Sequence, residues 1–500
     1  MSVAHSAACR CRGNWAAFGA WAALAGLSAG IITGCVDQGR EVQLYRDVLD
    51  DHQPKPKPLQ PGETLALERA LALANADNEQ IASQGETYLQ ALIAKNRAFA
   101  AFLPTVSFQP NFTVEQAPRG NAAAAAPGAP ATSAAAVAAS QGGYVQDGGV
   151  LRRLEAPVVG NMDFAYRSVP AFKGAEMTVV QQRQLLLDAR ATVLLNVAQT
   201  YYQVLISEGQ VAVLRHSLVL QGARVNDLQA RYNVRLALAL DVLQAKSNES
   251  ATRVQLSQAE NDQRNGRRTL ALLIGAPQVD GPLVDAALAP EAPAPMSAYV
   301  DRALAQRQDL LAAKAAAKAA RYAVDAAIAE YYPSASLNVA GFLYRQDYAN
   351  ASKWDGILVA NLPIFSGGAI KADVREAWSR LRQASLAESY LSREITQGVQ
   401  TAYDNFITSG GELAELQREV QASADAYQQA IQMERNGLAI PLDVLTAQDA
   451  LLNSQLQYAS EAFGRVVLEL DLLRAVGELD PLTPRSLHWS AAAPAPVNQQ

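Results

Sequence analysis

The sequence predicts a mainly α-helical protein with a transmembrane β part, built as a tandem internal repeat. Three observations predict this fold. Two blocks share residues at a constant offset, each block contains segments in which polar and apolar residues alternate, and each continues into a very long helical pattern. With 18% charged and 50% hydrophobic residues in 500, one elongated helical unit fits better than several compact domains.

The composition excludes two classes of function. The four histidines show no metal-ligand spacing, which argues against a zinc enzyme, and no cofactor is implied. The net charge is −6 and no lysine or arginine run is present, so nucleic acid is not expected as a partner. No nucleophile motif, phosphate loop or pair of catalytic carboxylates appears, so we do not expect an enzyme.

The N-terminus has the layout of a bacterial export signal. Arg10 and Arg12 precede residues 15–32, an uncharged stretch of 18 residues rich in Ala, Gly, Leu and Trp. The stretch ends in Ile32-Thr33-Gly34-Cys35, which resembles the lipobox of bacterial lipoproteins. We predict a signal peptide over residues 1–34. An uncleaved transmembrane anchor is the alternative, since 18 apolar residues can just span a membrane.

The lipobox implies that Cys35 is the lipidated first residue of the mature chain. Val36 follows it, whereas the inner-membrane retention signal is an aspartate at that position, so the outer membrane of a Gram-negative bacterium is favoured. Prolines are spaced through the next residues, and we expect 35–62 to be an extended, lipidated tether.

A repeat sets the architecture. The triplet Asp-Val-Leu begins at Asp241 and at Asp443, and a glycine follows each aspartate by 34 residues, at Gly275 and Gly477. The offset between the blocks is 202 residues, and it also relates Gly209 to Gly411 and Tyr201 to Tyr403. We therefore expect repeat 1 over 63–276, a linker over 277–298, repeat 2 over 299–479 and a flexible tail over 480–500.

Each repeat contains the same predicted elements. A helical stretch (64–102; 299–331) ends at a proline, Pro104 or Pro333. A pair of strands follows, near 105–115 and 161–167 in repeat 1 and near 334–344 and 354–362 in repeat 2. The pairs close on the similar phrases 169–174 and 362–368, after which long helices are expected over 175–234 and 369–436.

The return helices that begin at Asp241 and Asp443 are about half as long as these helices, so two short helices must stack end to end beside each long one. Repeat 1 also carries an insertion between its strands. Of residues 117–149, 22 are Ala, Gly or Pro, which favours an exposed, disordered loop over a helix.

Four strands per chain cannot close a barrel, and a lipid-exposed sheet edge would leave backbone groups unpaired. The chain must therefore oligomerise. Three copies give a 12-stranded barrel, within the range of membrane barrels, and gather the long helices into a tube.

The duplication, the proline-gated strand pairs, the phrase Pro-x-Phe-x-Gly-Gly at 363–368 and the phrase Asn436-Gly437-x5-Asp443-Val444-Leu445-x-Ala447 resemble the TolC-like outer-membrane efflux family over residues 63–479. The lipobox resembles its lipoprotein branch. The resemblance implies a homotrimeric 12-stranded barrel in the outer membrane, continued by a periplasmic α-helical barrel. It implies an exit duct for a tripartite efflux pump or type I secretion system, with a periplasmic adaptor and an inner-membrane pump as partners.

The resemblance also assigns roles at the periplasmic tip. Asp443 aligns with the first acidic ring residue of the tunnel entrance, although a carboxylate in the first turn of a helix opened by Pro441 has an ordinary helix-end role. Both roles stay open. In repeat 1 the corresponding tip has Asp241, and Arg235 stands where repeat 2 has Gly437.

Three positions depart from the family pattern. The second ring acid falls on Thr446, the tyrosine three residues before the glycine falls on Glu434, and the basic gate residue falls on Ala439. The resemblance therefore implies that the gate is locked by other contacts.

Two helix glycines, two tyrosines and one histidine have structural rather than catalytic explanations. Gly209 and Gly411 lie inside the long helices, where glycine costs about 1 kcal/mol relative to alanine, so we expect either a close helix neighbour in a belt around the tunnel or a kink. Tyr201 and Tyr403 are expected in the core, and His216 on a solvated face. The rival function is a non-conducting, adhesive coiled-coil lipoprotein, which has no use for strands with one apolar face.

Overall fold

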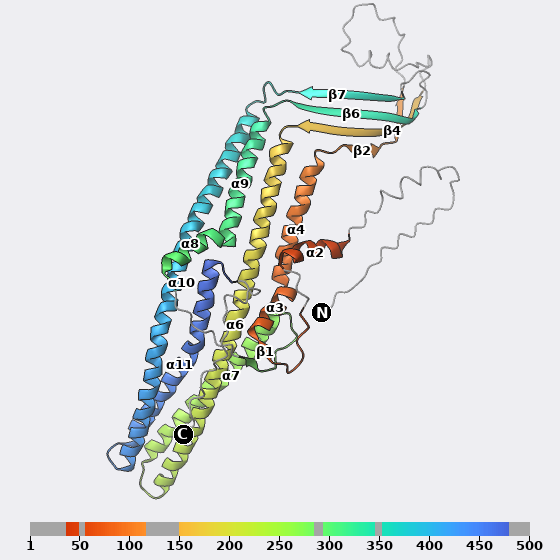
Figure 1. Cartoon of the computed structure of the whole chain (residues 1–500). Coiled ribbons are helices and arrows are strands. Elements are labelled where there is room, and N and C mark those ends of the chain that lie inside the picture. The colour runs from red at the N-terminus through yellow and green to blue at the C-terminus, as the bar shows by residue number, and fades with distance from the viewer. Residues whose placement is uncertain (1–36, 50–55, 117–149, 285–293, 346–352, 480–500) are drawn as a thin grey trace, which may run out of the picture.

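The computed structural model describes residues 37–49, 56–116, 150–284, 294–345 and 353–479. The described chain is an elongated helical bundle with an antiparallel sheet across one end and two helical hairpin tips at the other (Figure 1). The export signal, Cys35, the insertion 117–149 and the tail 480–500 lie outside these residues. Among the helices described, none has both the length and the apolar character needed to cross a membrane.

The two long helices run nearly the whole length of the bundle. Helix α6 spans Ser168–Asn233 and helix α10 spans Ala369–Arg435, with 66 and 67 residues. At 1.5 Å per residue each is about 100 Å long. The return helices α7 (Ala239–Leu273) and α11 (Pro441–Val476) have 35 and 36 residues, as the sequence predicted.

We expected the phrase 169–174 to precede the first long helix, but in the structure it forms the first turns of α6. Pro170 is compatible with this because the first N–H groups of a helix have no partner inside the helix. The matching phrase of repeat 2 stays a loop, and α10 begins only after Gly368, whose φ of 91° lies in the left-handed region.

Short helices stack end to end beside the long ones. In repeat 1, α3 (Leu67–Asp77) and α4 (Glu79–Ala100) are divided at Asn78, whose side chain accepts hydrogen bonds from the N–H groups that open α4. Asn78 Nδ2 also donates to the carbonyl of Leu273 at the end of α7, 3.0 Å away. In repeat 2, Arg307 divides α8 (Met296–Gln306) from α9 (Gln308–Ala329) and donates to Ala475 O of α11, at 3.2 Å.

The sheet has the order β2-β4-β6-β7, and all of its neighbouring strands are antiparallel. Strands β2 (Thr105–Phe108) and β3 (Asn111–Gln116) follow one another along β4 (Val150–Ala165), which is longer than the strand predicted at 161–167. Strands β6 (Ser334–Arg345) and β7 (Trp354–Asn361) lie where the period-two pattern predicted them. The seam between β4 and β6 joins the two repeats, and β2 and β7 are the outer edges.

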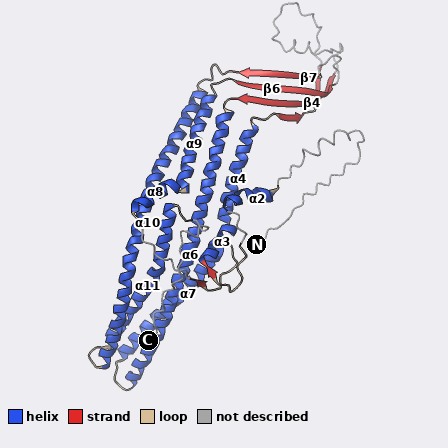
Figure 2. Cartoon of the chain, viewed as in Figure 1, coloured by secondary structure: helices blue, strands red, loops and turns tan. Residues whose placement is uncertain are grey.

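A smaller sheet lies at the middle of the bundle, where Figure 2 shows two short strands among the helices. Strand β1 (Leu65–Ala66) pairs in parallel with β5 (Leu283–Val284), which was not predicted. The hydroxyl of Tyr201 lies 2.8 Å from both Leu65 O and Val284 O, and Tyr201 is fully buried in the largest apolar cluster. The core position predicted for Tyr201 is confirmed, while Tyr403 is half-buried beside Tyr299.

The prediction of an extended tether is wrong for residues 38–49, which form helix α2 (Gln38–Leu49). Tyr45 and Leu49 are buried in the same apolar cluster, because α2 packs against α4 and α6. The Tyr45 ring lies directly over Gly85 of α4, where any Cβ would overlap it. Tertiary packing therefore stabilises a helix in a segment that proline spacing alone suggests is extended.

We predict that Gly85→Ala releases α2 and destabilises the chain by about 1–3 kcal/mol, the usual cost of overpacking a filled site. Thermal unfolding and limited proteolysis near residues 38–49 measure this. The matched control is Gly222→Ala in α6, where a Cβ meets nothing within 4 Å. It should be neutral or stabilising by up to about 1 kcal/mol. Equal effects of the two substitutions would contradict the contact.

Candidate functional site at the helical hairpin tips

The two hairpin tips, residues 231–243 and 433–445, lie side by side at the end of the bundle opposite the sheet (Figure 1). They turn in the same way. Arg235 has φ 66° and Gly437 has φ 74°. The next residue closes each turn with a 2.8 Å bond, from Leu236 N to Arg231 O and from Leu438 N to Met433 O. Left-handed backbone at the C-terminus of a helix is the common way to end it.

Arg235 is the one non-glycine residue with positive φ in the described ranges. Arg235 stands where repeat 2 has Gly437, and this tip keeps the same turn with a residue whose Cβ strains the backbone. Repeat 1 therefore holds a less favourable backbone than repeat 2 at an equivalent place.

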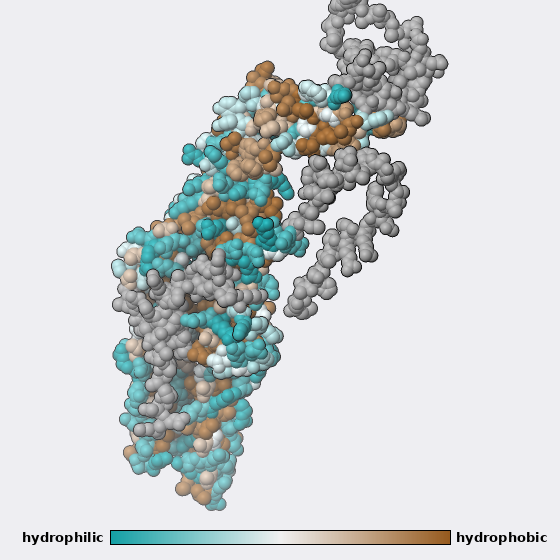
Figure 3. All heavy atoms as spheres, turned by 45° about the vertical axis from the view of Figure 1, so that its right-hand side comes forward, coloured by the Kyte–Doolittle hydropathy of each residue, from teal (hydrophilic) through white to brown (hydrophobic). Residues whose placement is uncertain are grey.

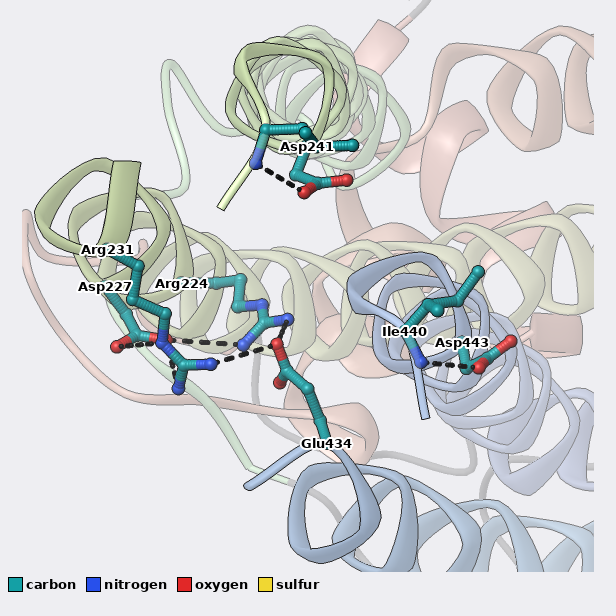
Figure 4. Close-up of polar contacts among 8 residues, drawn as sticks. Arg224, Asp227, Arg231, Asp241, Glu434, Ile440 and Asp443 are labelled. Atoms are coloured by element: carbon teal, nitrogen blue, oxygen red, sulfur yellow. Dashed lines mark hydrogen bonds and ion pairs between the residues drawn. The ribbon is translucent and has the colours of Figure 1, made fainter. Parts of the chain in front are cut away.

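Asp443 and Asp241 hold equivalent positions in the first turns of α11 and α7. Asp443 Oδ2 accepts a hydrogen bond from the N–H of Ile440 at 2.9 Å, and Asp241 Oδ2 accepts one from Leu238 at 3.0 Å (Figure 4). Asp443 is exposed and Asp241 is half-buried, and both carboxylates lie at the positive end of a helix dipole. The helix-end role of Asp443 is thus observed, and its place in an acidic ring stays a prediction.

Two of the positions that depart from the family pattern, Thr446 and Glu434, lie in opposite environments. Thr446 is exposed, and its hydroxyl donates to Leu442 O of its own helix at 2.9 Å. Glu434, in contrast, is buried, with only 4% of its side chain exposed. Its Oε1 lies 2.6 Å from Arg224 Nη2 and 3.3 Å from Arg231 Nη1, both on α6. Glu434 therefore ties the end of α10 to the end of α6.

Asp227 completes this cluster, the tip ion network of Arg224, Asp227, Arg231 and Glu434 (Figure 4). Asp227 Oδ2 lies 3.4 Å from Arg224 and 3.0 Å from Arg231, one turn away on the same helix. Only 9% of the Arg224 side chain is exposed. Two arginines and two carboxylates leave the network neutral. A buried pair is costly to break, because one charge is then left unpaired away from water.

Tyr427 of α10 lies close to the network. Burial raises the pKa of its phenol, the nearby Glu434 charge raises the same pKa further, and Arg224 opposes the shift. The phenol is therefore neutral, and the Tyr427 ring packs with Val444 and Leu451 of α11 in a buried apolar cluster.

Sequence reasoning found Glu434 only as a departure from a pattern and missed its partners. Arg224, Asp227 and Arg231 are spaced by 3 and 4 residues, which places them on one face of a helix, but this spacing is as common on solvated faces. Their contact with α10 depends on the packing of the two repeats.

The other predicted site residues lie far from the tips. A Cβ on Gly209 would sit 3.7 Å from Ala459, an ordinary contact, and one on Gly411 would meet nothing within 4 Å of this chain. The belt role of these glycines stays a prediction about the assembly. His216 is exposed, as expected. No group of three or more His, Cys, Asp or Glu residues that could hold a metal occurs in the described part.

Comparison with known proteins decides the family. The model of the outer membrane efflux protein family matches residues 162–276 and 299–478, more than half of the chain. The chain belongs to this family. The predicted family is confirmed, and with it an outer-membrane efflux protein rather than an enzyme.

Named relatives agree. The outer membrane efflux protein BepC of Brucella suis is 27% identical over 312 residues, which cover 61% of this chain and 67% of BepC. The toluene efflux pump outer membrane protein TtgF of Pseudomonas putida is 28% identical over 56% of this chain, and the match covers only 60% of TtgF. The cation efflux system protein CusC of Escherichia coli K12 is 24% identical over 56% of this chain and 63% of CusC.

Solved structures share the fold. The outer membrane protein VceC of Vibrio cholerae superposes with a TM-score of 0.71 at 19% identity, over 82% of this chain and 96% of VceC. The CmeC outer membrane channel of Campylobacter jejuni gives a TM-score of 0.71 at 17% identity, over 84% of this chain and 87% of CmeC. The shared architecture is the helical bundle with a sheet at one end.

We predict that Arg235→Gly stabilises the first tip by about 1 kcal/mol, because glycine adopts positive φ without the clash of a Cβ. The matched substitution Gly437→Ala should destabilise the second tip by a similar amount. Hydrogen exchange of residues 231–243 and 433–445 reports each local opening. Slower exchange in the first variant and faster exchange in the second are expected, and the reverse signs would refute the strain.

Proposed function

We propose that the chain is the outer-membrane exit duct of a tripartite efflux pump, and that it acts as a homotrimer. The observation that carries the proposal is a sheet with two open edges at one end of a long helical bundle. The sheet is four strands wide, because β2 and β3 lie end to end along β4. Three copies close these edges into a 12-stranded barrel and bring the long helices around one axis. A type I secretion duct would use the same architecture, so the cargo is set by the inner-membrane pump.

Surface hydropathy supports a membrane position for the sheet. Apolar residues gather over the sheet in Figure 3, whereas much of the helical bundle is hydrophilic. Thirteen large apolar residues on the strands of the large sheet are more than one-third exposed in the single chain. They are Val106, Phe108, Phe112, Val114, Leu154, Phe164, Val339, Leu343, Tyr344, Trp354, Ile357, Leu358 and Val359. A rival adhesive coiled coil offers no account of these exposed apolar residues.

The hairpin tips are the proposed contact for the periplasmic adaptor. Both tips expose apolar side chains next to their turns, with Leu236 78% and Leu438 72% exposed. Apolar patches of this kind, rimmed by polar residues, are typical of protein-binding surfaces. The adaptor would couple the duct to an energised inner-membrane pump, and the duct itself needs no cofactor.

Cys35 is proposed as the lipid anchor in the outer membrane. The lipobox supports this, and helix α2, which begins three residues later, packs against α4. Mass spectrometry of the mature N-terminal peptide should find a diacylated or triacylated Cys35. An unmodified cysteine, or an intact leader, would remove the anchor from the proposal.

We propose that the tip ion network holds the closed state. It would take the role of the family's gate contacts, because Glu434, Ala439 and Thr446 stand where the family pattern has other residues. Glu434→Gln removes the charge that joins α10 to α6 and should destabilise the closed tips by about 3 kcal/mol. We expect a larger fraction of open time in planar bilayers. Asp227→Asn is the control, since it leaves the Arg224 to Glu434 contact in place and should have a smaller effect. Unchanged gating in Glu434→Gln trimers would exclude the network as a lock.

Asp443 is proposed to form an acidic ring on the trimer axis. The purified protein should conduct in planar bilayers with a preference for cations, because three carboxylates attract cations and repel anions. Asp443→Asn keeps the acceptor for Ile440 N–H and removes the charge, so it should lower this preference. The difference should shrink in high salt, where the screening length falls below its value of about 10 Å at 0.1 M.

Asp241→Asn is the matched control for that experiment, because Asp241 makes the same helix-end bond. Absence of conductance in the wild type would contradict the duct. Equal selectivity of wild type and Asp443→Asn would remove Asp443 from the pore lining.

A further inference from the structure

The segment that follows β7 in the chain contains the two most exposed large apolar residues of the described chain, Ile364 at 94% and Phe365 at 89%. We propose that residues 362–365 continue strand β7 and pair with β2 of a second copy of the chain, with Leu362 opposite Phe108 and Ile364 opposite Val106. This inference rests on the proposed oligomeric duct and adds the register of its intermolecular seam.

The internal repeat supplies the register. Thr105 and Ser334 each follow a helix-ending proline and begin the first strand of a repeat. Thr105 lies opposite Asn161 in the β2·β4 pair, and Ser334 lies opposite Asn361 in the β6·β7 pair. Asn161 and Asn361 are therefore equivalent positions of the two repeats.

The seam between β4 and β6 is then the internal counterpart of a seam between β7 and β2 of the next copy. Across the internal seam, Phe164 lies opposite Ala335 and Ala165 lies opposite Ser334. Carried over to the equivalent positions, these pairs become Ile364 opposite Val106 and Phe365 opposite Thr105. This equivalence follows the strand register and not the match of the phrases 169–174 and 362–368, since 169–174 lie inside α6 and 362–368 precede α10. By the strand register, the residues exposed after β7 correspond to residues that β4 pairs inside the chain.

Hydrogen-bond direction gives an independent check. In antiparallel strands, successive residues direct their N–H and C=O groups to opposite neighbours. Phe342 N–H donates to Lys353 O at 2.9 Å, so odd-numbered residues of β7 bond to β6 and even-numbered ones face the open edge. Gln109 N–H donates to Pro157 O at 3.0 Å, so even-numbered residues of β2 also face their open edge. The proposed register sets even against even, and a one-residue slip would not.

The prolines fit this register. Pro363 is odd-numbered, so its missing N–H lies on the β6 side, beyond Ser334 where β6 begins, and no ladder bond is lost there. Pro110 is even-numbered and can accept but not donate across the seam. It lies between β2 and β3, where the strand is already interrupted.

The side chains match as well. In this register the even-numbered apolar residues of both edges share one face, so Leu358, Leu362 and Ile364 lie opposite Phe112, Phe108 and Val106. All three of the latter are more than half exposed in the single chain. Apolar cross-strand pairs each contribute about 0.2–1 kcal/mol. The opposite face pairs Thr105 and Ser107 with Phe365 and Pro363.

Cysteine pairs test the register in the full-length protein in its membrane. Phe365→Cys with Thr105→Cys, and Asn361→Cys with Gln109→Cys, place thiols at directly opposite, non-hydrogen-bonded positions. On mild oxidation both pairs should give dimers and closed trimers on non-reducing gels. The off-register control Phe365→Cys with Val106→Cys should give at least about five-fold less, because its side chains lie on opposite faces and a disulfide needs close, facing Cβ atoms.

Single-cysteine variants correct for the native cysteines, and native mass measurement gives the number of chains. Trimers in which the off-register pair links as well as the in-register pairs, or in which neither in-register pair links, would overturn the register while leaving the duct intact. Single chains by mass, with no linkage in any variant, would overturn the proposed duct itself.

Discussion

The structure depends on how the backbone N–H and C=O groups at the two open edges of its antiparallel sheet find hydrogen-bond partners. A strand edge in water can be solvated, but an edge in hydrocarbon leaves each N–H and C=O group unpaired at a cost of several kcal/mol. Here the edges β2 and β7 also expose apolar side chains on a sheet that ends a long helical bundle. In the proposed trimer, closure on other copies of the chain would satisfy the backbone and turn apolar side chains toward lipid.

The duplication explains how one chain can supply such a closure. The contact between the repeats already contains a strand seam, β4 against β6, above a helix contact, α6 against α9. Contacts between chains need only repeat this internal arrangement around an axis. The same duplication places Asn78 and Arg307 at equivalent breaks, where each short helix meets the end of a return helix and the two together match the length of the long helix.

At the tips the two repeats share one backbone turn but differ in their side chains. Repeat 1 turns at a strained Arg235 and repeat 2 at Gly437, and only repeat 2 supplies the buried acid Glu434. Repeat 1 contributes Arg224, Asp227 and Arg231 and repeat 2 contributes Glu434, so the network joins the two repeats. A small buried apolar cluster of Val225, Leu228, Val242, Ala245 and Leu445 joins the same two hairpins, so charge pairing and apolar packing both hold them together.

The sequence predicted those parts of the fold that local pattern determines. Proline ended the short helices at the right places, and alternation located β2, β3, β6 and β7. Features that depend on distant contacts were missed. Helix α2 exists because Tyr45 packs over Gly85, and β1 and β5 are two residues long, too short to show a period.

The candidate site shows the same division. Asp443 and Asp241 were found because each begins the repeated triplet Asp-Val-Leu, and their observed hydrogen bonds are local. The partners of Glu434 were not found, since Arg224 and Arg231 are more than 200 residues away in the chain. Family resemblance named the position, and only packing shows that a buried ion pair replaces the expected tyrosine.

Electron cryo-microscopy of the purified full-length protein in lipid nanodiscs would show directly whether the sheet edges pair between chains. We expect a threefold particle in which β7 of each chain pairs with β2 of the next, so that twelve strands close into a barrel that continues into a helical tunnel. A single chain with both sheet edges unpaired, or a closed ring of another number of chains, would contradict it.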